Sequence, residues 1–391
     1  MKHYDYIFTG SGLAALMTVY KMITSGKFAD KSILLIDSDS KKKNDRTWCF
    51  WQDGPSTWEQ SVTKKWDLAL FANSDFRRDL ELKPYTYNRI IASDFYSQVF
   101  DLISKQENIR FLNEKVTDIN ELKTHVYVAT ETQSFTGDKL FNSIYRKGEA
   151  ESQNQYPVLQ QHFIGWFIKS KQAVFNPEQA TFMDFSVAQK GNTRFMYVLP
   201  TSTSEALLEY TLFSHDLLTK SEYENEIQKY ILKLGITDYE ITEKEQGSIP
   251  MTCYPFWKKN TQRVLNIGTA GGWTKASTGY TFKGSDKKST ALIAFLQKEN
   301  DLTKFHRSTK FWFYDLLLLD ILDRKNEEGS GIFSSMFKKG SPALIFKFLD
   351  EETSLYEDIK VILKCPKMPF IWSLIRSVRY LFYRSKTSIK Q

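Results

Sequence analysis

Hydrophobic and polar residues follow two different periods near the N-terminus, and the change from one period to the other predicts the first elements. Tyr4–Thr9 has the pattern of a buried strand, and Leu13–Ile23 has the pattern of a helix. A second apolar run, Ser32–Ile36, predicts another strand. A strand, a helix and a strand in this order are typical of a parallel sheet, so we expect an α/β fold of the Rossmann type.

The rest of the chain divides into a part with both strands and helices and a part made mostly of helices. The predicted elements are a helix at Asp94–Lys105, strands at Ile109–Leu112 and Thr124–Ala129, adjacent strands at Phe195–Leu199 and Ala206–Phe213, and a helix at Glu222–Leu234. The turn between the two adjacent strands indicates an antiparallel β region. Residues 300–363 are predicted to be largely helical, with an apolar run at Phe313–Leu322.

The first predicted turn carries a pattern of small residues that suits a dinucleotide. Gly10 allows a tight turn, Gly12 lets the backbone approach a pyrophosphate, and Ala15 lets the helix pack closely on the strand. The N-terminal amides of that helix favour an anion. Asp37 ends the second strand 25 residues after Gly12, close to the spacing of about 20 expected for an acid that binds ribose. The alternative interpretation is a glycine-rich turn without a ligand.

A second glycine-rich run lies far away in the sequence, at residues 268–280, directly after the apolar strand Arg263–Ile267. Two separate backbone approaches are what FAD needs, because its pyrophosphate and its isoalloxazine contact different segments. The residues of this run that we expect to contact FAD are Gly268, Gly271, Gly272, Thr278 and Gly279. The sequence therefore predicts a flavin dinucleotide held by two distant segments.

We interpret the chain as one unit built from interleaved segments, long enough to bury a large core. Residues of about 1–50, 90–150 and 260–295 are assigned to FAD binding, and residues of about 51–89 and 151–259 to a substrate region. Residues 296–391 are assigned to a helical C-terminal part that ends in a basic amphipathic tail, 360–391.

Composition limits the kind of protein further. The chain of 391 residues has no run of 18 apolar residues, so no helix that spans a bilayer is predicted. The first strand begins close to Met1, so we expect no signal peptide and a cytoplasmic location. The three cysteines, Cys49, Cys253 and Cys365, are scattered, so neither a disulfide framework nor a metal site is expected.

Positive charge gathers at the C-terminus. No acidic residue follows Asp358, whereas eight basic residues do, against a net charge of +7 for the whole chain. Apolar residues between Phe370 and Phe382 fall at helical spacing, and the opposite side holds Ser373, Arg376, Ser377 and Tyr380. Such a helix suits peripheral attachment to an anionic membrane, or else it is an ordinary helix packed on the body with a solvated basic face. Nucleic-acid binding is not expected, because no stacking motif accompanies the charge.

Aromatic residues make up 15% of the chain, and large aromatic walls suit a long apolar substrate. They can also stabilise a carbocation through cation–π attraction. Trp48, Phe50 and Trp273 lie in the candidate site segments, and we expect them to line a substrate pocket. The alternative for each of them is ordinary core packing.

Glu209 is the candidate catalytic acid. It lies in the predicted strand Ala206–Phe213, which is otherwise suited to burial. A carboxyl group in apolar surroundings has a raised pKa and can stay protonated at neutral pH, as a general acid must. Strand alternation leaves a second interpretation open, in which Glu209 points outward between buried neighbours.

Several short motifs occur in a fixed order along the chain. They are Gly10-Ser11-Gly12-Leu13-Ala14-Ala15, Arg46-Thr47-Trp48-Cys49-Phe50, Gln160-Gln161-His162-Phe163-Ile164-Gly165-Trp166, Met183-Asp184-Phe185, Phe195-Met196-Tyr197-Val198-Leu199-Pro200, Leu208-Glu209-Tyr210-Thr211, Gly247-Ser248-Ile249-Pro250-Met251-Thr252, Gly268–Tyr280 and Phe348-Leu349-Asp350-Glu351. In this order, and over nearly the whole chain, they resemble the motifs of the flavin-dependent lycopene β-cyclases of bacterial carotenoid biosynthesis.

The resemblance implies an isomerase of the intramolecular lyase class that uses reduced FAD without net oxidation, with NADPH as the source of electrons. In that reaction the ψ end of lycopene gains a proton at C2, the C5–C6 double bond closes the ring, and a C6 proton leaves. The products are γ-carotene and then β-carotene. The family's catalytic acid maps onto Glu209, and Asp184 is the secondary candidate. The family's second acid position holds Tyr210, and Lys275-Ala276 stands where many relatives have His-Pro.

Two other functions stay open from the sequence. One is a flavin-dependent oxidoreductase, such as a monooxygenase or a prenyl reductase, that acts on a long isoprenoid. The other is a non-catalytic prenyl-binding protein on a flavin fold, against which the presence of Gly10, Gly12 and Asp37 argues. The expected partners are lycopene and other acyclic carotenoid ends at a membrane surface, and no particular protein partner is indicated.

Overall fold

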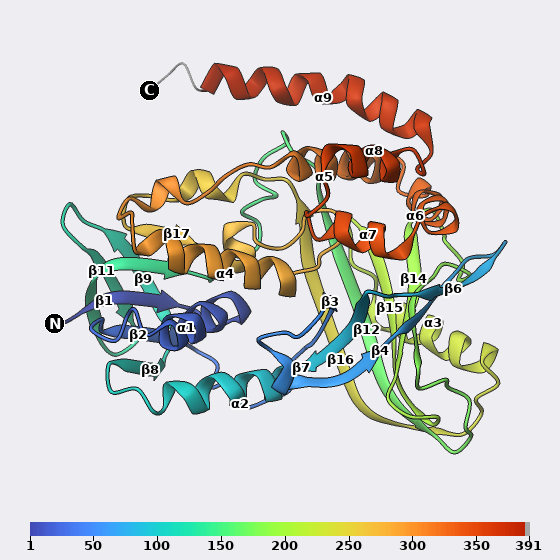
Figure 1. The fold of residues 1–391 in the computed structure, drawn as a ribbon, viewed down its shortest axis with the longest axis horizontal. Helices are drawn as coiled ribbons and strands as arrows, with labels where there is room; N and C mark the ends of the chain where they lie inside the picture. The colour runs from blue at the N-terminus through green and yellow to red at the C-terminus, as the bar shows by residue number, and fades with distance from the viewer. Residues whose placement is uncertain (388–391) are drawn as a thin grey trace.

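The computed structural model describes the backbone of residues 1–387 and the side chains up to Ser377. Within these residues the strands form three sheets. The N-terminal sheet lies at one end of the molecule and a second large sheet at the other, with helices of the C-terminal part along one side (Figure 1). Single-turn 3₁₀ helices lie at Glu59–Ser61, Phe256–Lys259, Gly268–Gly271 and Leu302–Lys304.

The first sheet contains the N-terminal strand–helix–strand unit. Its strands, in spatial order, are β8 (Ile109–Asn113), β2 (Ile33–Asp37), β1 (Lys2–Thr9), β11 (Ser134–Asn142), β10 (Val126–Thr130) and β9 (Val116–Glu121), and β17 (Val264–Asn266) pairs with β11. Strands β8, β2, β1, β11 and β17 run parallel, whereas β10 and β9 are antiparallel additions. The last residues of three parallel strands, Thr9, Asn142 and Asn266, are aligned. The two glycine segments, residues 10–15 after β1 and residues 268–280 after β17, therefore leave the sheet at the same edge.

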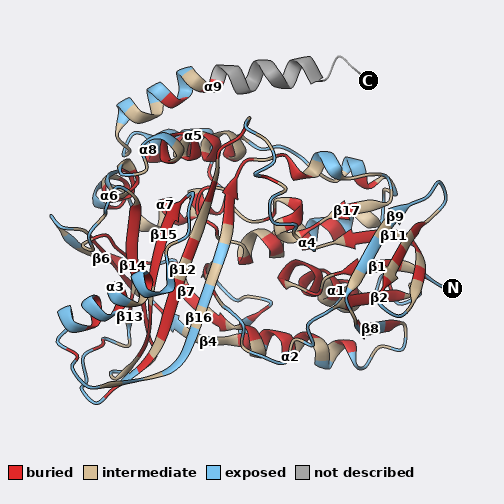
Figure 2. Cartoon of the chain, turned by 180° about the vertical axis from the view of Figure 1, so that it is seen from behind, coloured by how far each residue is buried: buried red, intermediate tan, exposed pale blue. Residues whose placement is uncertain are grey.

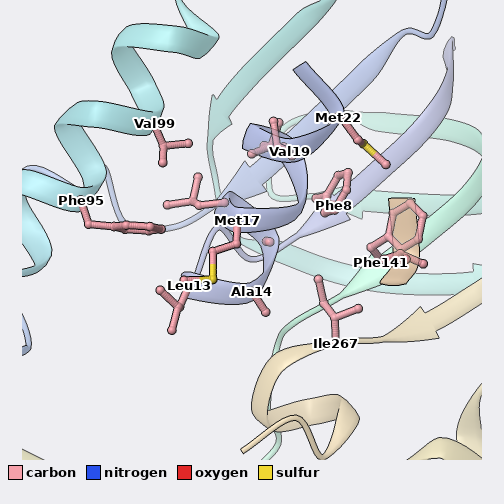
Figure 3. Close-up of a cluster of buried hydrophobic side chains, with 14 of the residues drawn as sticks. Phe8, Leu13, Ala14, Met17, Val19, Met22, Phe95, Val99, Phe141 and Ile267 are labelled. Atoms are coloured by element: carbon pink, nitrogen blue, oxygen red, sulfur yellow. The ribbon is translucent and has the colours of Figure 1, made fainter. Parts of the chain in front are cut away.

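Helices α1 (Leu13–Ser25), α2 (Ala92–Ile103) and α4 (Phe282–Leu296) contribute to one continuous core with this sheet. Phe8 and Phe141 of the sheet lie on the side of α1 that carries Val19 and Met22, and all four belong to that core (Figure 3). Helix α1 ends at Gly26, which has a φ of 66° and donates its amide to the Ile23 carbonyl. A residue with positive φ is a common helix terminator, because it turns the chain and satisfies a free carbonyl.

The second sheet is almost entirely antiparallel. Its strands, in spatial order, are β16 (Tyr239–Thr252), β12 (Val158–Ser170), β15 (Glu205–Ser214), β14 (Thr193–Pro200), β13 (Gln179–Asp184), β5 (Leu68–Ala72) and β6 (Arg77–Glu81), with β13 and β5 parallel. Helix α3 (Lys220–Lys233) packs on one face, against residues such as Leu208 and Leu212 of β15. The alternate residues Leu207 and Phe213 belong to a different core cluster, on the other face.

A small sheet of β3 (Thr47–Asp53), β7 (Tyr85–Ile91) and β4 (Val62–Trp66) joins these two parts. Phe50 of β3 stacks on Phe282 of α4, with ring centroids 4.3 Å apart. The next residue, Trp51, points to the other side of the strand and stacks on Phe346 at 4.7 Å. The alternating side chains of one short strand therefore tie the first core to the C-terminal helices.

The C-terminal helices form the outermost layer. They are α5 (Lys310–Arg324), α6 (Glu328–Lys339), α7 (Pro342–Leu349), α8 (Leu355–Ile362) and α9 (Lys367–Thr387). Helix α9 lies across the top of the molecule in Figure 1. Among the residues that the structure describes, no helix is long and apolar enough to cross a membrane.

Helix α9 turns its polar side toward the body. The Arg376 guanidinium donates to the Asp320 carboxylate of α5 at 2.6 and 2.9 Å, and the Ser373 hydroxyl donates to the Leu317 carbonyl at 2.9 Å. Ile371, Trp372, Leu374 and Ile375 are instead 45–57% exposed. Within residues 367–377 the helix therefore does pack on the body, as the second interpretation expects, but through its polar side, and Arg376 is not solvated as that interpretation supposes. Arg379, Arg384, Lys386 and Lys390 lie outside the part whose side chains are described.

Most predicted elements are confirmed, with ends shifted by a few residues: β1, α1, β2, α2, β8, β10, β14, β15, α3 and the helical C-terminal part. Two strands were not expected from the sequence, β12 and β16, which are the longest of the second sheet. Polar residues are frequent along β16, and the residues in its middle are exposed or half-buried (Figure 2). That strand lacks the regular alternation that a half-buried strand shows, because part of its inner face borders a cavity.

Candidate active site

The two glycine segments meet in space. Gly268 has a φ of 59°, and a Cβ atom built on it would lie 3.3 Å from Ala14 Cβ in the first turn of α1. Ile267, the residue before it, lies beside the same helix (Figure 3). The second segment therefore packs directly on the helix that begins at the first glycine segment, residues 10–15, which we call the first fingerprint.

In the first fingerprint there is room for a side chain at Gly12 but not at Gly10. A Cβ atom on Gly12 would meet no atom within 4 Å, whereas one on Gly10, whose φ is 84°, would lie 2.4 Å from Ser143 Oγ. Gly12 is the N-cap of α1 and no side chain caps that helix, so its first amides face open space. Such a helix start suits a diphosphate. Ala15 is fully buried in the core under α1.

Asp37 lies at the end of β2 and contacts the fingerprint itself. Its Oδ2 atom accepts hydrogen bonds from the Ser11 amide at 2.6 Å and from the Ser11 hydroxyl at 2.9 Å. The Lys41 ammonium lies 3.4 Å from the same oxygen. The acid is therefore held beside the turn by residues of the chain.

The second segment follows a path that only glycine can take at several points. A Cβ on Gly271 would lie 2.1 Å from the Asn266 carbonyl oxygen, and Gly272 has a φ of 66°. Gly279 has a φ of 72°, and a Cβ there would lie 1.9 Å from Gln161 Oε1 of β12. Both Gln161 Oε1 and Thr278 Oγ1 are buried without a hydrogen-bond partner. Buried polar atoms are nearly always paired, so these two atoms point to a ligand.

A cavity of about 260 Å³ lies between this segment and the second sheet. Thr269, Thr278 and Gly279 line it from the glycine segment. Its aromatic lining consists of Trp48, Phe163, Phe182, Phe195, Tyr197, Phe213, Tyr280 and Phe282. Ligand sites typically combine such an apolar lining with a few polar groups.

Two carboxyl groups on one row of the second sheet are among the polar groups that line this cavity. Gly165 of β12 pairs with Glu209 of β15 on one side and with Glu245 of β16 on the other. A Cβ on Gly165 would lie 3.2 Å from Glu245 Cγ and 3.5 Å from Glu209 Cβ. The two carboxyl groups hydrogen-bond to each other. The inward interpretation of Glu209 therefore holds, and the outward one is wrong.

Each carboxyl group has its own hydroxyl donor. The Thr211 hydroxyl donates to Glu209 at 2.8 Å, and the Thr47 hydroxyl donates to Glu245 at 2.8 Å. Burial raises the pKa of Glu209 well above its usual value, and the nearby Glu245 charge raises it further. Burial also raises the pKa of Glu245 to about 7, against the opposing effect of the Thr47 donor. Burial and the neighbouring charge therefore both favour the protonated form of Glu209.

Tyr210 faces away from this pair. It packs with Leu208 and Leu212 in the core beneath α3, and its hydroxyl lies 3.4 Å from an Arg194 nitrogen. Successive residues of a strand point to opposite faces, so an acid at position 210 would not have faced the same cavity as Glu209.

The wall next to Glu209 carries hydroxyl and thiol groups that stay neutral. Tyr197 pairs with Glu209 across β14 and β15, and its hydroxyl hydrogen-bonds to the Tyr87 hydroxyl. Burial raises the pKa of Tyr87, Tyr197 and Tyr280, and it raises the pKa of the Cys49 thiol to about 12. These groups therefore add no charge near the carboxyl pair at neutral pH.

The other predicted site residues are placed differently. Trp48 lines the cavity and also packs on Phe95 and Tyr96. Phe50 and Trp273 do not line this cavity. Phe50 is buried in the core, where it stacks on Phe282, and Trp273 borders two other cavities. Asp184 lies on β13, away from the Glu209 cavity, and accepts hydrogen bonds from the Tyr230 hydroxyl at 2.7 Å and the Ser186 amide at 2.8 Å.

Comparison with known proteins supports the resemblance seen in the motifs. The family model described as lycopene cyclase protein matches residues 5–375. This chain belongs to the lycopene cyclase family. A lycopene beta-cyclase of Pantoea ananas is 25% identical over 293 residues, covering 71% of this chain and 71% of that one.

Solved structures show the fold of this lycopene cyclase family member. A geranylgeranyl bacteriochlorophyll reductase-like protein from Thermoplasma acidophilum has a TM-score of 0.60 at 10% identity, over 93% of this chain and 96% of that one. A p-nitrophenol 4-monooxygenase from Pseudomonas putida has a TM-score of 0.58 at 13% identity, over 93% and 97%. A halogenase in complex with FAD has a TM-score of 0.55 at 11% identity, over 88% and 78%. The predicted α/β fold, that of Rossmann-type flavoproteins, is confirmed.

Sequence reasoning missed Glu245, Gly165 and Thr47, which complete the carboxyl pair of this lycopene cyclase family member. Glu245 lies in the stretch Glu243-Lys244-Glu245, which has the appearance of an ordinary solvated strand. The available signal was Gly165, since an isolated glycine inside a strand often marks a close approach of neighbouring groups. Among the described residues, no group of three or more His, Cys, Asp or Glu could hold a metal ion.

The raised pKa of Glu245 predicts a pH dependence of stability. The folded protein keeps a proton that the unfolded chain releases near its ordinary pKa of 4.5, so the free energy of unfolding should fall as pH rises from about 4.5 to about 7. The free energy of unfolding of Glu245→Gln should fall less over this pH range. Above pH 7 it should exceed that of the wild type by on the order of 1–3 kcal/mol. Urea unfolding at pH 5 and pH 8 measures it, with the exposed Glu240→Gln on the same strand as control. An identical pH dependence of Glu245→Gln and wild type would contradict the buried pair.

Proposed function

We propose that this chain is a lycopene β-cyclase in which Glu209 is the general acid. The observation that carries the proposal is a carboxylic acid kept protonated by burial, in a cavity that borders the second glycine segment of a flavoprotein fold. Membership of the lycopene cyclase family gives the substrate class. The reaction is an isomerisation without net redox change.

The residues of the two glycine segments fit FAD. Gly12 and the uncapped start of α1 leave space and free amides for its pyrophosphate. Thr278 and Gln161, which line the cavity and each have an unpaired polar atom, would hold the isoalloxazine end. When reduced by NADPH, the flavin would supply negative charge that stabilises a cation in a water-poor pocket.

The side chains of the cavity account for the proton movements. Glu209 would deliver its proton to C2 of the ψ end group, the C5–C6 double bond would close the ring, and the C6 proton would return to a carboxylate of the pair. The ring faces of Tyr197, Phe182 and Phe282 would stabilise the positive charge through cation–π attraction. The substrate is far longer than the cavity, so one end group would enter at a time, giving γ-carotene and then β-carotene.

We further propose that the protein attaches to an anionic membrane through the exposed apolar surface of α8 and α9. This α8–α9 surface consists of Leu355, Tyr356, Ile359, Ile362, Leu363, Met368, Ile371, Trp372, Leu374 and Ile375. The basic residues Lys360, Lys364 and Lys367 lie among them and are exposed. Exposed apolar side chains interspersed with lysine are typical of helices that lie in a membrane interface.

Expression in lycopene-producing bacteria tests the function. The wild-type chain should convert lycopene to β-carotene, whereas Glu209→Gln should lower cyclisation by about 10²–10⁴-fold, because an amide cannot deliver a proton to carbon. Pigments are measured by chromatography, and FAD content and folding are measured on the purified proteins. Glu205→Gln, on the same strand but outside the cavity, is the matched control and should leave cyclisation unchanged.

Three outcomes would contradict this proposal. Unaltered lycopene in cells that hold folded wild-type protein would exclude a cyclase. Consumption of NADPH in proportion to product would favour a flavin oxidoreductase instead. Cyclisation by Glu209→Gln at the wild-type rate would exclude Glu209 as the acid, with Asp184 the next candidate.

Gly12→Val tests the cofactor site. Gly12 has an extended backbone with a φ of −76°, which valine adopts readily, and its Cβ would meet open space. The variant should therefore fold normally but lose FAD, because the new side chain fills the space for the pyrophosphate. Flavin absorbance of the purified protein is the measurement, and Gly331→Val, at another glycine with open space, is the control. Stoichiometric flavin in Gly12→Val would show that the assigned turn is wrong.

Replacing Trp372 and Ile375 together by serine tests the membrane surface. Their side chains are 55% and 57% exposed, and each should contribute about 1.5–3 kcal/mol when buried in lipid. Sedimentation with vesicles of phosphatidylglycerol and phosphatidylcholine should show at least about tenfold weaker binding, and high salt should weaken wild-type binding. Leu232→Ser, at a 63% exposed leucine on α3, is the control. Unchanged sedimentation of the double variant would rule out this surface.

A further inference from the structure

We propose that Glu245 is the positioning partner of Glu209, accepting the hydrogen bond of the Glu209 acid group so that the pair carries one proton and presents it to the cavity. The inference rests on the proposed cyclase function and goes beyond it by adding a second carboxyl group from a different strand. In this chain the family's second acid position holds Tyr210, which faces α3. We therefore assign the acid next to Glu209 to Glu245, on a different strand.

The register of three strands brings the two carboxyl groups together. Adjacent strands lie about 4.8 Å apart, so residues two strands apart are ordinarily separated by the side chain between them. Here the intervening residue is Gly165, which pairs with both glutamates. Any side chain at this position would have to fit against Leu207 Cδ1 at 2.8 Å and Glu245 Cγ at 3.2 Å. The absence of a side chain lets the two glutamates reach across the row to each other.

The two carboxyl groups are held differently although they lie side by side. Glu245 accepts a hydrogen bond from Thr47, which comes from the small sheet rather than from the sheet that carries the pair. Glu209 accepts from Thr211, two residues along its own strand. Both glutamates line the cavity, but the donor of Glu245 comes from a different sheet, so Thr47 fixes Glu245 independently of the strand that carries Glu209.

The charges around the pair favour a proton on Glu209 and a negative charge on Glu245. Arg89 of β7 and Glu243 of β16 act on Glu245, with opposite signs. Cys49 of β3, Tyr197 of β14 and Tyr280 of the second glycine segment border the same cavity, and burial keeps all three neutral. Asp45 and Arg46 also line the cavity and form an ion pair with each other at 3.2 Å. The charge that most directly opposes ionisation of Glu209 is that of Glu245.

The pair balances the proton cycle of the proposed reaction. Glu209 loses its proton to C2 and becomes a carboxylate, so the pair then carries two negative charges beside the cation. These charges stabilise the cation and give the C6 proton a base to return to. After that return the pair again holds one proton, and neither an oxidant nor an outside proton donor is consumed.

The pH dependence of cyclisation separates this role from a purely structural one. Glu209 acts while protonated, and removing the Glu245 charge lowers its pKa. In Glu245→Gln the alkaline limb of kcat/KM should therefore move to lower pH by about one to three units, the usual effect of a nearby charge. Glu243→Gln removes a charge from the same strand two residues away and should move that limb far less. A Glu245→Gln profile that falls in height without moving would overturn the proposal.

Thr47→Val keeps the test decisive if Glu245→Gln folds poorly. Valine preserves the shape of threonine but removes the donor that stabilises the Glu245 carboxylate, so the pKa of Glu245 should rise. The acid limb of the profile should then move to higher pH. An acid limb at its wild-type position would count against the pair.

Infrared titration of the purified protein tests the pair without any catalysis. The stretching band of the protonated Glu209 carboxyl group, identified by its loss in Glu209→Gln, should disappear at lower pH in Glu245→Gln than in wild type. If this band moves but wild type makes no cyclic carotenoid, the pair stands and the proposed function fails. If wild type makes β-carotene but neither the band nor the alkaline limb moves, the function stands and the pair is overturned.

Discussion

The packing of residues 268–280 between α1 and β12 is the constraint on which the candidate site depends. Gly268 touches Ala14 at one end of this segment, and Gly279 meets Gln161 at the other. Both glycines have positive φ, where a side chain would strain the backbone as well as collide with its neighbour. The segment can follow this path because it carries no side chain at either point. Thr269, Thr278 and Gly279 then form one wall of the cavity.

The carboxyl pair shows how the same fold accommodates groups that resist burial. Two carboxylates side by side in an apolar cavity would repel each other and lose their hydration. Retention of one proton, together with donors from Thr47 and Thr211, removes most of that penalty. Burial thus favours a protonated Glu209, and a protonated group is what general-acid chemistry requires. A stability that depends on pH accompanies this arrangement.

The C-terminal helix follows a different logic from the core. Asp320, only 1% exposed, binds Arg376 of α9 and Arg324 of its own helix, and Ser373 and Ser377 are also buried. Polar contacts therefore attach α9 to the body while Trp372 and Ile375 face outward. An ordinary amphipathic helix would do the reverse, because apolar burial is the larger source of stability. Up to Ser377, the helix therefore leaves its apolar face uncovered by the rest of the described chain.

Local patterns in the sequence determined much of this protein. Local features could be predicted because they depend only on neighbouring residues and on the backbone angles that each residue allows. They include the strand Tyr4–Thr9, the helix after Gly12 and the turns at the two glycine segments. The motif order also identified the family. Only the tertiary structure decided that Glu245 meets Glu209, that Tyr210 faces α3 and that α9 turns its apolar side outward. These outcomes depend on strand register and on which face packs against the body, and both are set by contacts between residues far apart in the chain.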